Sequence, residues 1–390
     1  MTEWDIAVIG GGVAGSTAAA LLAQRGLRVI LLEKGALPRQ KVCGEFLSPE
    51  GVEVLRRLGV WSRLEAHHPP RIHSFTLTAG DLETRHPLPL PGWGVSRWVL
   101  DHVLWEHAAC VGVTTRERCA VVQAAGDFQH GFSLTLQQPD LAPAHIRARA
   151  VLCAAGRHWH PRGQRKEPHA SRHSRFIGIK AHFRGVPLDG HVELHTMRHG
   201  YCGLVEVTGG VTNLCGWVEA KVLRRAGGTP PKVLTSALSE NSRLRSRLRE
   251  AQQVGTQWTT TSFVHGRTGL AVPVAAQMWN AGDCAAMVAP FTGDGMGMGL
   301  RAAELAATMM LAGFRHELSW EEATAEYARR WRREFLPRLR WGRGLEAVLL
   351  QPWLATLSCW ILDRAPSLID QLYRRTRQLI PVAGPPMEVS

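Results

Sequence analysis

The sequence predicts an α/β fold, in which a Rossmann-like domain of the Gly-x-Gly-x-x-Gly type carries an inserted antiparallel β-sheet and is followed by a C-terminal helical region. Three observations predict it. A Gly-rich loop, Gly10–Gly15, stands between an apolar run and an Ala-rich run. Residues 176–217 alternate in the manner of strands. Residues 300–380 have a helical pattern, which we expect Pro337, Pro352 and Pro366 to break into pieces.

Length and composition indicate a globular chain of two or three packed units. The 390 residues are 45% hydrophobic and 20% charged, which excludes a disordered or fibrous protein. We expect no membrane span and no secretory signal, because no apolar run reaches about 18 residues and no basic segment precedes the first apolar run. The eight Cys are scattered without a Cys-x-x-Cys pair, which favours reduced thiols and a cytoplasmic protein.

The charge is strongly basic, with a formal net charge of +13. Only six of the 46 basic residues are Lys, and such a skew toward Arg often reflects genomic base composition. A basic chain suits an acidic ligand, a nucleic acid or an anionic membrane as partner. The sequence has no zinc finger, no RNP-type aromatic motif and no Lys-rich tail, so we expect no nucleic-acid partner.

The first motif is a strand, a Gly-rich loop, a helix and a second strand within about 30 residues, the context that a dinucleotide-binding loop requires. The loop follows the strand that ends at Ile9 and precedes the helix that begins at Ser16. Gly10 permits a tight turn, Gly12 lets the backbone approach a pyrophosphate, and Gly15 lets the helix pack closely on the strand. The unsatisfied N–H groups at the helix start then hold the phosphate charge.

The second strand, Leu27–Glu33, ends in an acid that is placed to accept both hydroxyls of a ribose. A carboxylate there disfavours a 2′-phosphate. The site is therefore predicted to hold the adenosine diphosphate part of an NAD- or FAD-type cofactor rather than NADP.

The second motif, residues 279–301, decides which cofactor is expected. A strand ends at Ala281, and Gly282-Asp283 forms a turn whose carboxylate can accept a ribityl hydroxyl. Pro290 stiffens the following loop, and three glycines leave backbone N–H groups bare before a long helix that we expect from Leu300. The dipole of that helix would stabilise negative charge on a reduced flavin. The glycines are Gly293, Gly295 and Gly297.

Together the two motifs resemble the FAD-dependent aromatic hydroxylase superfamily (p-hydroxybenzoate hydroxylase type), and more closely its geranylgeranyl reductase-like branch. The resemblance covers roughly residues 1–315. It runs in order through Gly10–Gly15, Glu33, 41–45, 96–101, 155–157, 200–201 and 282–299.

This resemblance implies one non-covalently bound FAD, a discontinuous FAD domain, and a β-sheet substrate domain over the isoalloxazine ring. It implies that Arg97 contacts the cofactor and that the Cys43-Gly44 loop passes near the flavin. The complete set of expected cofactor-binding residues is Gly10, Gly12, Val13, Ala14, Gly15, Glu33, Lys34, Cys43, Gly44, Arg97, Val121, Gly282, Asp283, Pro290, Gly293, Gly295, Met296 and Gly297.

The expected domain boundaries follow from the motifs. The FAD-binding domain comprises residues 1–70, 95–160 and 262–316. The substrate domain comprises residues 71–94 and 165–261, and the C-terminal helical region comprises residues 317–390.

Three departures from the family pattern bear on the chemistry. Aromatic hydroxylases usually have Ala-Asp-Gly where this chain has Ala154-Ala155-Gly156, and loss of the acid puts direct docking of NADPH in doubt. The aromatic stretch of the reductase branch keeps only Tyr201. The Trp-x-Trp-x-Ile-Pro stretch of flavin halogenases is absent, which disfavours halogenation.

Cys43 and Tyr201 are the candidate catalytic residues, Cys43 as a proton donor and Tyr201 as a hydrogen-bond partner of substrate. A small apolar filler and an interior tyrosine are the alternatives. His195 and His199 lie too far apart on a strand to share a metal ion, and we expect no metal site.

We therefore predict an FAD-dependent oxidoreductase that acts on an apolar or aromatic small molecule, with NADH or NADPH as electron donor. We favour a monooxygenase that hydroxylates or epoxidises its substrate, because this chain keeps only the tyrosine of the aromatic stretch that is typical of the reductase branch. A reductase of an isoprenoid or lipid double bond is the alternative. A non-catalytic, membrane-associated flavin-binding protein is the second alternative.

The last expectation concerns the membrane. Residues 329–343 hold seven Arg and two Trp, and the apolar segment Leu345–Leu362 follows them. A solvated helix face is the plain interpretation of the Arg run. The two segments together also suit peripheral contact with an anionic membrane through residues 329–362.

Overall fold

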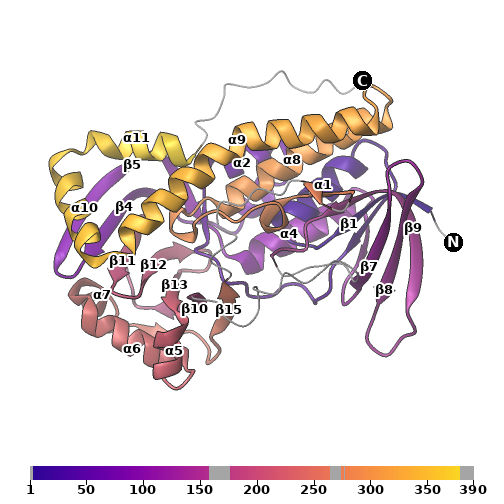
Figure 1. Ribbon diagram of the computed structural model, residues 1–390. Coiled ribbons are helices and arrows are strands. Elements are labelled where there is room, and N and C mark those ends of the chain that lie inside the picture. The colour runs from indigo at the N-terminus through magenta and orange to yellow at the C-terminus, as the bar shows by residue number, and fades with distance from the viewer. Residues whose placement is uncertain (1–2, 158–175, 264–273, 276, 378–390) are drawn as a thin grey trace.

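The structure is a computed structural model that describes residues 3–157, 176–263, 274–275 and 277–377. Parts of the predicted domains, namely residues 158–160, 165–175, 264–273 and 378–390, lie outside the described residues. Two β-sheets form the framework, with helices packed around them (Figure 1). The predicted α/β class is confirmed.

Sheet A contains the predicted nucleotide-binding unit. Its strand order is β16-β17-β9-β1-β2-β6, and β1 pairs in parallel with both β2 and β9. Parallel strands with covered faces are buried and continuously apolar, as β2 is throughout. The strands are β1 (Glu3–Ile9), β2 (Val29–Leu32), β6 (Thr114–Arg116), β9 (Ala144–Cys153), β16 (Val274–Ala275) and β17 (Met278–Asn280), with the hairpin of β7 (Ala120–Asp127) and β8 (Gly131–Gln137) attached to β9.

Helices cover sheet A, and the small residues of α1 let them approach closely. α1 packs against both α4 and α8, and nine of its eleven residues are buried. The helical elements of this layer are α1 (Val13–Ala23), α2 (Pro49–Leu58), α3 (Trp61–Glu65), α4 (Arg97–Cys110), the short turns η2 (Gly282–Cys284) and η3 (Pro290–Thr292), and α8 (Gly295–Phe314).

Sheet B is the predicted inserted sheet, in the order β14-β10-β13-β12-β11-β4-β5-β3, with β15 beside β10. One pairing departs from the expected antiparallel pattern, because β4 and β11 are parallel: a long excursion through sheet A separates them. The strands are β3 (Phe46–Leu47), β4 (Arg71–Ala79), β5 (Leu82–Gly94), β10 (Phe176–Arg184), β11 (His191–Met197), β12 (Gly200–Val207), β13 (Val211–Glu219), β14 (Gln252–Gln253) and β15 (Thr259–Phe263).

The two faces of sheet B have different covers. Three short helices, coloured rose in Figure 1, lie under one face and enclose an apolar cluster that includes Leu204 and Leu214. The opposite face turns toward sheet A and the C-terminal helices. The three helices are α5 (Ala220–Arg225), α6 (Pro230–Glu240) and α7 (Ser242–Arg247).

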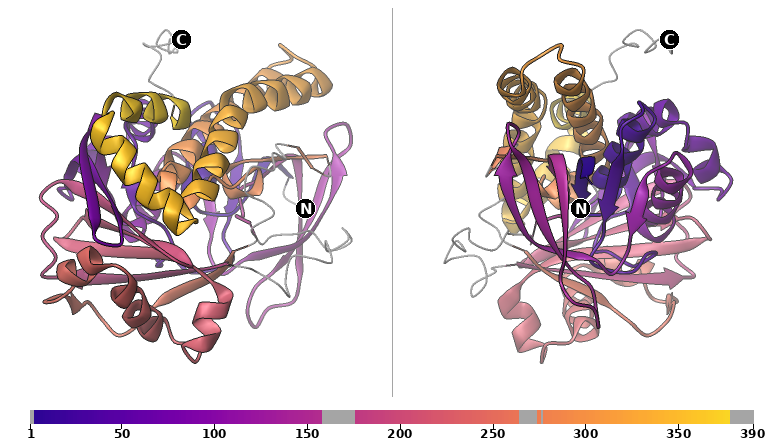
Figure 2. Two further views of the ribbon diagram at one scale, coloured as in Figure 1. Left: turned by 60° about the vertical axis from the view of Figure 1, so that its left-hand side comes forward. Right: turned by 90° about the vertical axis from the view of Figure 1, so that its right-hand side faces the viewer.

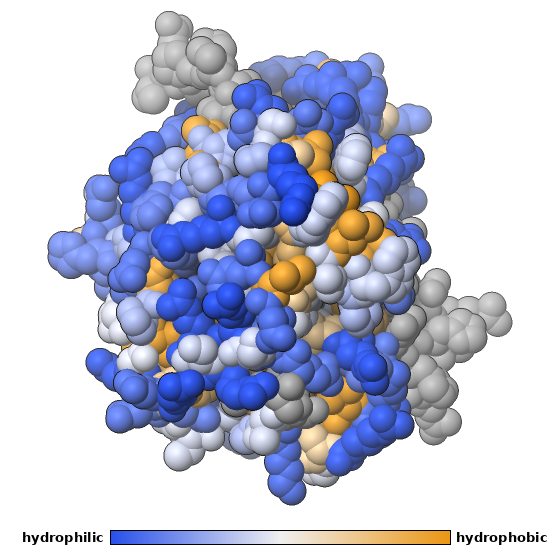
Figure 3. Space-filling view, turned by 90° about the vertical axis from the view of Figure 1, so that its left-hand side faces the viewer, coloured by the Kyte–Doolittle hydropathy of each residue, from blue (hydrophilic) through white to orange (hydrophobic). Residues whose placement is uncertain are grey.

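The C-terminal region folds as three helices, α9 (Trp320–Leu349), α10 (Pro352–Arg364) and α11 (Ser367–Thr376). α9 packs along α8, whereas α10 and α11 pack on β4 and β5, on the side of the molecule that the left view of Figure 2 brings forward and that faces the viewer in Figure 3. The expectation that Pro337 breaks the helix is wrong, because α9 runs through it. The carbonyl of Arg333, which loses its N–H partner, belongs to an exposed residue and can bond to water. Pro352 and Pro366 do mark helix starts.

Within the described residues, no single helix is both long enough and apolar enough to cross a membrane. α9 and α10 meet the length and composition requirement only as a pair, and they are bent by 109° relative to each other.

Candidate functional site

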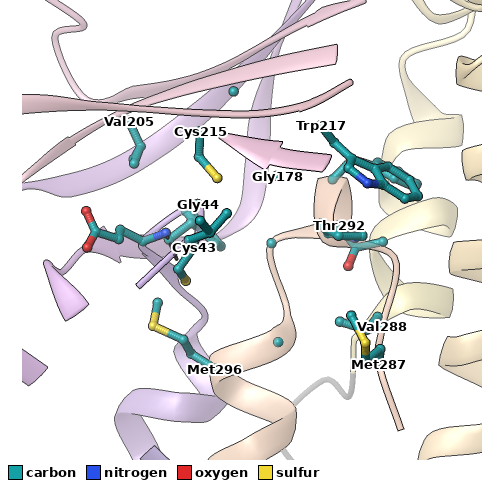
Figure 4. A pocket seen from close by; sticks show the side chains of 18 of the residues that line it. Cys43, Gly44, Gly178, Val205, Cys215, Trp217, Met287, Val288, Thr292 and Met296 are labelled. Carbon is teal, nitrogen blue, oxygen red and sulfur yellow. Dashed lines mark hydrogen bonds between the residues drawn. The ribbon is translucent and has the colours of Figure 1, made fainter. Parts of the chain in front are cut away.

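A cavity of about 970 Å³ lies between the carboxyl edge of sheet A and the inner face of sheet B. Ligands of open parallel α/β sheets bind at this edge, where the loops after the strands converge. Figure 4 shows side chains from both sides of the cavity: Cys215 and Val205 point from sheet B toward the loop that carries Cys43 and Gly44. Both predicted motifs and both candidate catalytic residues contribute to its wall.

The first Gly-rich loop has the geometry that its spacing predicts. Gly10 has φ +105°, and a Cβ there would lie 2.5 Å from the carbonyl oxygen of Ala154. A Cβ on Gly15 would lie 1.8 Å from the carbonyl oxygen of Gly10, so α1 can pack here only without a side chain. Gly12 is different, because the space beside it opens into the cavity.

The N-terminus of α1 points its free donors at this space. Gly12 caps the helix without any side-chain hydrogen bond, and the first intrahelical bond runs from the N–H of Ser16 to the carbonyl of Gly12. The N–H groups of the first turn therefore have no acceptor within the helix. Val13 and Ala14, in that turn, line the cavity.

Glu33 lies at the end of β2 and is only 3% exposed. Its Oε2 accepts a hydrogen bond from the N–H of Gly11 at 2.9 Å, which ties the first loop to the second strand. Its Oε1 accepts from the N–H of Gly35 at 2.9 Å and from Arg39 at 2.8 Å. Glu33 and Lys34 both line the cavity, beside the loop that is expected to bind the pyrophosphate.

The second motif forms the opposite end of the same wall. α8 begins at Gly295 rather than at Leu300, and its first intrahelical bond runs from Met298 to Asp294. Gly295 and Met296 line the cavity in this uncapped first turn. Gly293 was expected to leave its N–H bare, but that N–H donates to the carbonyl of Pro290 at 3.1 Å.

These features fit FAD. Two helix N-termini without side-chain caps face one cavity, and each is a site where negative charge is stabilised. The α1 terminus would hold the pyrophosphate, with Glu33 at the adenosine ribose. Asp283, in the turn after β17, would accept a ribityl hydroxyl, and the α8 terminus would face the flavin ring.

Most of the expected cofactor residues meet at this cavity, but four do not line it. The lining members are Gly12, Val13, Ala14, Glu33, Lys34, Cys43, Gly44, Arg97, Gly282, Asp283, Pro290, Gly293, Gly295 and Met296. Gly10 and Gly15 shape the turn from behind, as described above. A Cβ on Gly297 would lie 2.2 Å from Oγ of Ser48, so this glycine serves packing against α2. Val121 lies on β7 in the apolar cluster behind sheet A.

Arg97 is the first residue of α4 and is held by a buried carboxylate. Asp101 accepts from Nε and Nη2 of Arg97, both at 2.9 Å, and also pairs with Lys41 Nζ at 2.6 Å. Burial lowers the pKa of Lys41 by more than Asp101 raises it. Arg97 therefore reaches the cavity wall in a fixed orientation, beside a second cation.

Sequence reasoning missed a buried ionic cluster behind the Cys43 loop. The carboxylate of Glu45 contacts Lys180 Nζ at 2.5 Å and His182 Nε2 at 3.0 Å, and it accepts from the N–H of Arg97 at 2.7 Å. Lys180 Nζ also donates to the carbonyl of Lys41 at 3.3 Å. Burial opposes the charge of Glu45, but His182 and Lys180 hold its pKa below the usual range.

This cluster fastens the Cys43 loop to the inner face of sheet B. Glu45 has φ +62°, a left-handed conformation that a non-glycine residue adopts only where its surroundings enforce it. One feature of the sequence could have indicated this cluster. Lys180 stands in an apolar, alternating strand, and a charge at such a position needs a buried partner. Nothing in the sequence named Glu45 as that partner.

The candidate catalytic residues both line the cavity. Cys43 is half-buried; its carbonyl accepts from Asn213 at 3.0 Å, and its Sγ accepts from the N–H of Glu45 at 3.4 Å. Tyr201 is buried on β12 with its ring centroid 6.1 Å from that of Trp217. Burial raises the pKa of Tyr201 well above its usual value, so its hydroxyl stays protonated.

Beyond Tyr201 the cavity continues as an apolar chamber that the sequence did not predict. Its walls are the inner face of sheet B on one side and the three C-terminal helices on the other. We call this part the apolar chamber; it is lined by Phe75, Leu77, Leu88, Val192, Leu194, Leu345, Val348, Leu349, Ser358, Ile361, Leu362, Leu368, Ile369, Leu372 and Tyr373.

Comparison with known proteins agrees with this geometry. A family profile described as FAD binding domain matches residues 3–318, which include both motifs and sheet B. The chain belongs to this FAD-binding family. It is thus an FAD-dependent oxidoreductase of the aromatic hydroxylase-type superfamily, as predicted.

Two relatives extend the comparison. Menaquinone reductase of Mycolicibacterium smegmatis is 29% identical over 337 residues, covering 80% of this chain and 77% of the relative. Squalene monooxygenase of Mus musculus is 31% identical over 91 residues, covering 23% of this chain and 16% of the relative.

Solved structures share the fold. The myxobacterial chondrochloren halogenase superposes with a TM-score of 0.80 at 20% identity, covering 97% of this chain and 91% of the other. The flavin-dependent brominase Bmp2 superposes with a TM-score of 0.74 at 18% identity, over 96% and 93% of the two chains. These neighbours share the fold of the FAD-binding family and do not single out its geranylgeranyl reductase-like branch.

Proposed function

We propose that this protein uses reduced FAD to saturate a carbon–carbon double bond in an apolar, isoprenoid-like chain. The apolar chamber carries the proposal, because it extends from the flavin end of the cavity along sheet B to α10 and α11. A long hydrocarbon gains about 25 cal/mol for each Å² of apolar surface that it removes from water in such a chamber. A small polar aromatic would leave most of the chamber unfilled.

When bound, FAD supplies the hydride for such a reduction, and the chain must position the double bond and supply one proton. Cys43 and Tyr201 are the proton-bearing groups that sequence analysis singled out, and both line the cavity. Tyr201 is held protonated by burial. The Glu45 cluster fixes the loop that carries Cys43, so the thiol is presented to the cavity from a rigid backbone.

The relatives support a reductase over the monooxygenase that the sequence pattern favoured first. The similarity to menaquinone reductase spans most of both chains, whereas the similarity to squalene monooxygenase covers 23% of this chain. Oxygenation of the same kind of chain is the second candidate. This second candidate is supported by that partial similarity and by the ability of reduced flavins to react with O₂.

The test separates electron donor, substrate and oxygen. Purified protein loaded with FAD is reduced without oxygen by NADH or by NADPH, and the loss of the yellow absorbance is recorded. Menaquinone or squalene is then added, still without oxygen. The proposal predicts that the absorbance returns and that mass spectrometry, after the quinone ring has been reoxidised in air, finds a product whose isoprenoid chain has gained two hydrogen atoms.

Each other outcome rejects a different part of the expected reaction: its type, its electron donor or its substrate. Return of absorbance only in air, with a product that gains one oxygen atom, would establish the monooxygenase. No bleaching with either nucleotide, followed by bleaching with chemically reduced ferredoxin or with dithionite, would remove NADH and NADPH as donors. No substrate-dependent return of colour under any condition would reject both reactions.

A further inference from the structure

The outer face of α10 exposes four large apolar side chains. Trp353 is 67% exposed, Leu357 41%, Trp360 52% and Ile361 37%. They stand at positions i, i+4, i+7 and i+8, so they share one side of the helix. We call these four residues the α10 face. Contiguous exposed apolar side chains rimmed by polar ones mark protein, ligand or membrane contact sites.

The α10 face lies directly over the apolar chamber. Ser358, Ile361 and Leu362 of the same helix line the chamber, and Ile361 is both a lining residue and an exposed one. A single helix therefore separates chamber from exterior here. On this side of the molecule hydrophobic side chains reach the surface in several patches among hydrophilic ones (Figure 3).

One arginine borders the α10 face and favours an anionic partner. Arg364 follows the face along the helix and stacks over Trp360, 4.1 Å from the ring centroid, while its Nη1 lies 3.9 Å from Asp363. Two further exposed arginines, Arg374 and Arg375, lie at the end of α11, where Arg375 stacks over Trp341 of α9. Exposed Trp and aliphatic side chains with Arg nearby are typical of a helix that lies in an anionic lipid surface.

The arginine run that sequence analysis assigned to this role is not one solvated face. Arg338 is 4% exposed and donates to Glu50 at 2.8 and 2.9 Å. Arg329 and Arg330 both pair with Glu326 of the same helix. Because α9 is helical, the arginines of residues 329–343 point in different directions around it, and Arg338 points into the core. Most of the exposed large apolar residues of these two helices lie on α10, while α9 contributes Trp341, which is 42% exposed.

We propose that the α10 face inserts shallowly into an anionic lipid bilayer, so that an apolar substrate passes from the lipid into the chamber without crossing water. The proposal rests on the proposed function for the substrate and on the exposed residues for the contact. Trp side chains suit the headgroup level, because their rings are apolar while the indole N–H keeps a polar partner.

The first experiment measures binding without turnover. FAD-loaded protein is floated with vesicles of phosphatidylcholine containing phosphatidylglycerol, and with vesicles of phosphatidylcholine alone. We expect binding to the anionic vesicles that weakens as salt rises. The double variant Trp353→Gln/Trp360→Gln should bind at least about tenfold more weakly, with unchanged FAD content.

The control is Leu141→Gln, which removes an apolar side chain of 60% exposure in the loop between β8 and β9. This variant should bind like the wild type. The proposal is overturned if wild-type protein ignores anionic vesicles at low salt, or if the double variant binds as well as the control. It is also overturned if sedimentation shows a dimer through α10 that does not bind vesicles.

A second readout separates this proposal from the proposed function. Saturation of the isoprenoid chain is followed by mass spectrometry with menaquinone embedded in vesicles and with a short-chain prenylated quinone in solution. The double variant should be slow only with the embedded substrate. A wild-type protein that binds vesicles but saturates the chain of neither quinone refutes the reductase and leaves the membrane contact standing.

Discussion

Gly12 and Gly15 of the first loop are each required for a different reason, because a Cβ at each position would meet different neighbours. Gly15 faces the backbone of Gly10, whereas the nearest atom to a Cβ on Gly12 is Lys41 Nζ at 3.4 Å. A side chain on Gly12 would therefore occupy ligand space, and a side chain on Gly15 would occupy protein.

We predict that Gly12→Val folds normally but purifies colourless, because its methyl groups take the place of the pyrophosphate. Gly15→Val is predicted to lose about 3 kcal/mol of stability, because the α1 backbone must move away from the loop. Flavin absorbance and urea unfolding measure the two effects. Retention of FAD by Gly12→Val would refute the assignment of the loop.

Glu346 shows how a buried acid shifts stability with pH. It is 2% exposed on α9, and its Oε1 has no hydrogen-bond partner among the described residues. Burial raises its pKa to about 7, although Arg343 opposes the shift. The folded protein therefore binds the proton of this carboxyl group more tightly than the unfolded chain does. The contribution of Glu346 to the free energy of unfolding is most favourable below pH 4.5 and falls as the pH rises toward 7.

Replacing Glu346 by Gln should remove this dependence. The free energy of unfolding should rise by about 3 kcal/mol at pH 8 and change little at pH 4.5, since each pKa unit corresponds to about 1.4 kcal/mol. Urea unfolding at the two pH values measures it, with the exposed Glu321→Gln on the same helix as control. Equal gains at both pH values would show that ionisation is not the cause.

At the scale of elements, α9 is anchored through one guanidinium. Arg338 donates to Glu50 of α2 and, at 3.3 Å, to Asp294 at the cap of α8. Burial raises the pKa of Asp294 to about 6, even though Arg338 acts against it. Three helices thus share one buried ionic group close to the start of α8, where the flavin ring is expected.

Arg338→Leu should destabilise the protein by about 3–5 kcal/mol, because the buried carboxylates of Glu50 and Asp294 both lose the guanidinium that they share. Arg332→Leu, exposed on the same helix, should change stability by less than about 0.5 kcal/mol. Denaturant unfolding of both variants at neutral pH decides the matter. Similar losses in the two would mean that the Arg338 ion pairs contribute nothing specific.

Local chemistry explains why some elements were predictable and others were not. The β1–α1–β2 unit is specified by residues close together in sequence, and the structure has it where the pattern placed it. The start of α8 was misplaced by five residues because glycines lower helix propensity, while tertiary packing against Ser48 favours glycine there. Packing likewise carries α9 through Pro337.

At the scale of the whole molecule, the apolar chamber joins segments from both ends of the chain. Ser358 of α10 faces β4 and β11, which lie more than a hundred residues upstream, across the chamber. Under the proposed function, the C-terminal helices would therefore limit the length of the substrate, whereas the residues expected to bind the cofactor lie in the N-terminal half and in η2, η3 and α8.

Ser358→Trp should fill part of the chamber without touching the nucleotide loops. Under the proposed function, FAD content stays normal, and saturation of the chain of long-chain menaquinone slows at least about tenfold, since overpacked apolar space excludes ligand. Thr356→Trp, on the exposed side of α10, is the matched control. If Ser358→Trp and Thr356→Trp react with long-chain menaquinone at equal rates, the isoprenoid chain does not bind in the apolar chamber.

The sequence by itself determined the strand–loop–helix geometry of the expected cofactor site, because a dinucleotide loop is made by backbone geometry and needs only glycines, an acid and the right spacing. It also indicated that sheet B is inserted and that the C-terminus is helical. Such features depend on local periodicity and on neighbours within one or two elements.

Only the tertiary structure decided which charges are buried and what encloses the substrate end. Glu45 and Lys180 are 135 residues apart, and Arg338 and Glu50 are 288 apart. A charge becomes part of a core only when folding brings a partner within hydrogen-bond distance, since an unpaired ion would cost more than the fold can supply. The apolar chamber has the same origin, because its walls exist only once α10 and α11 pack over sheet B.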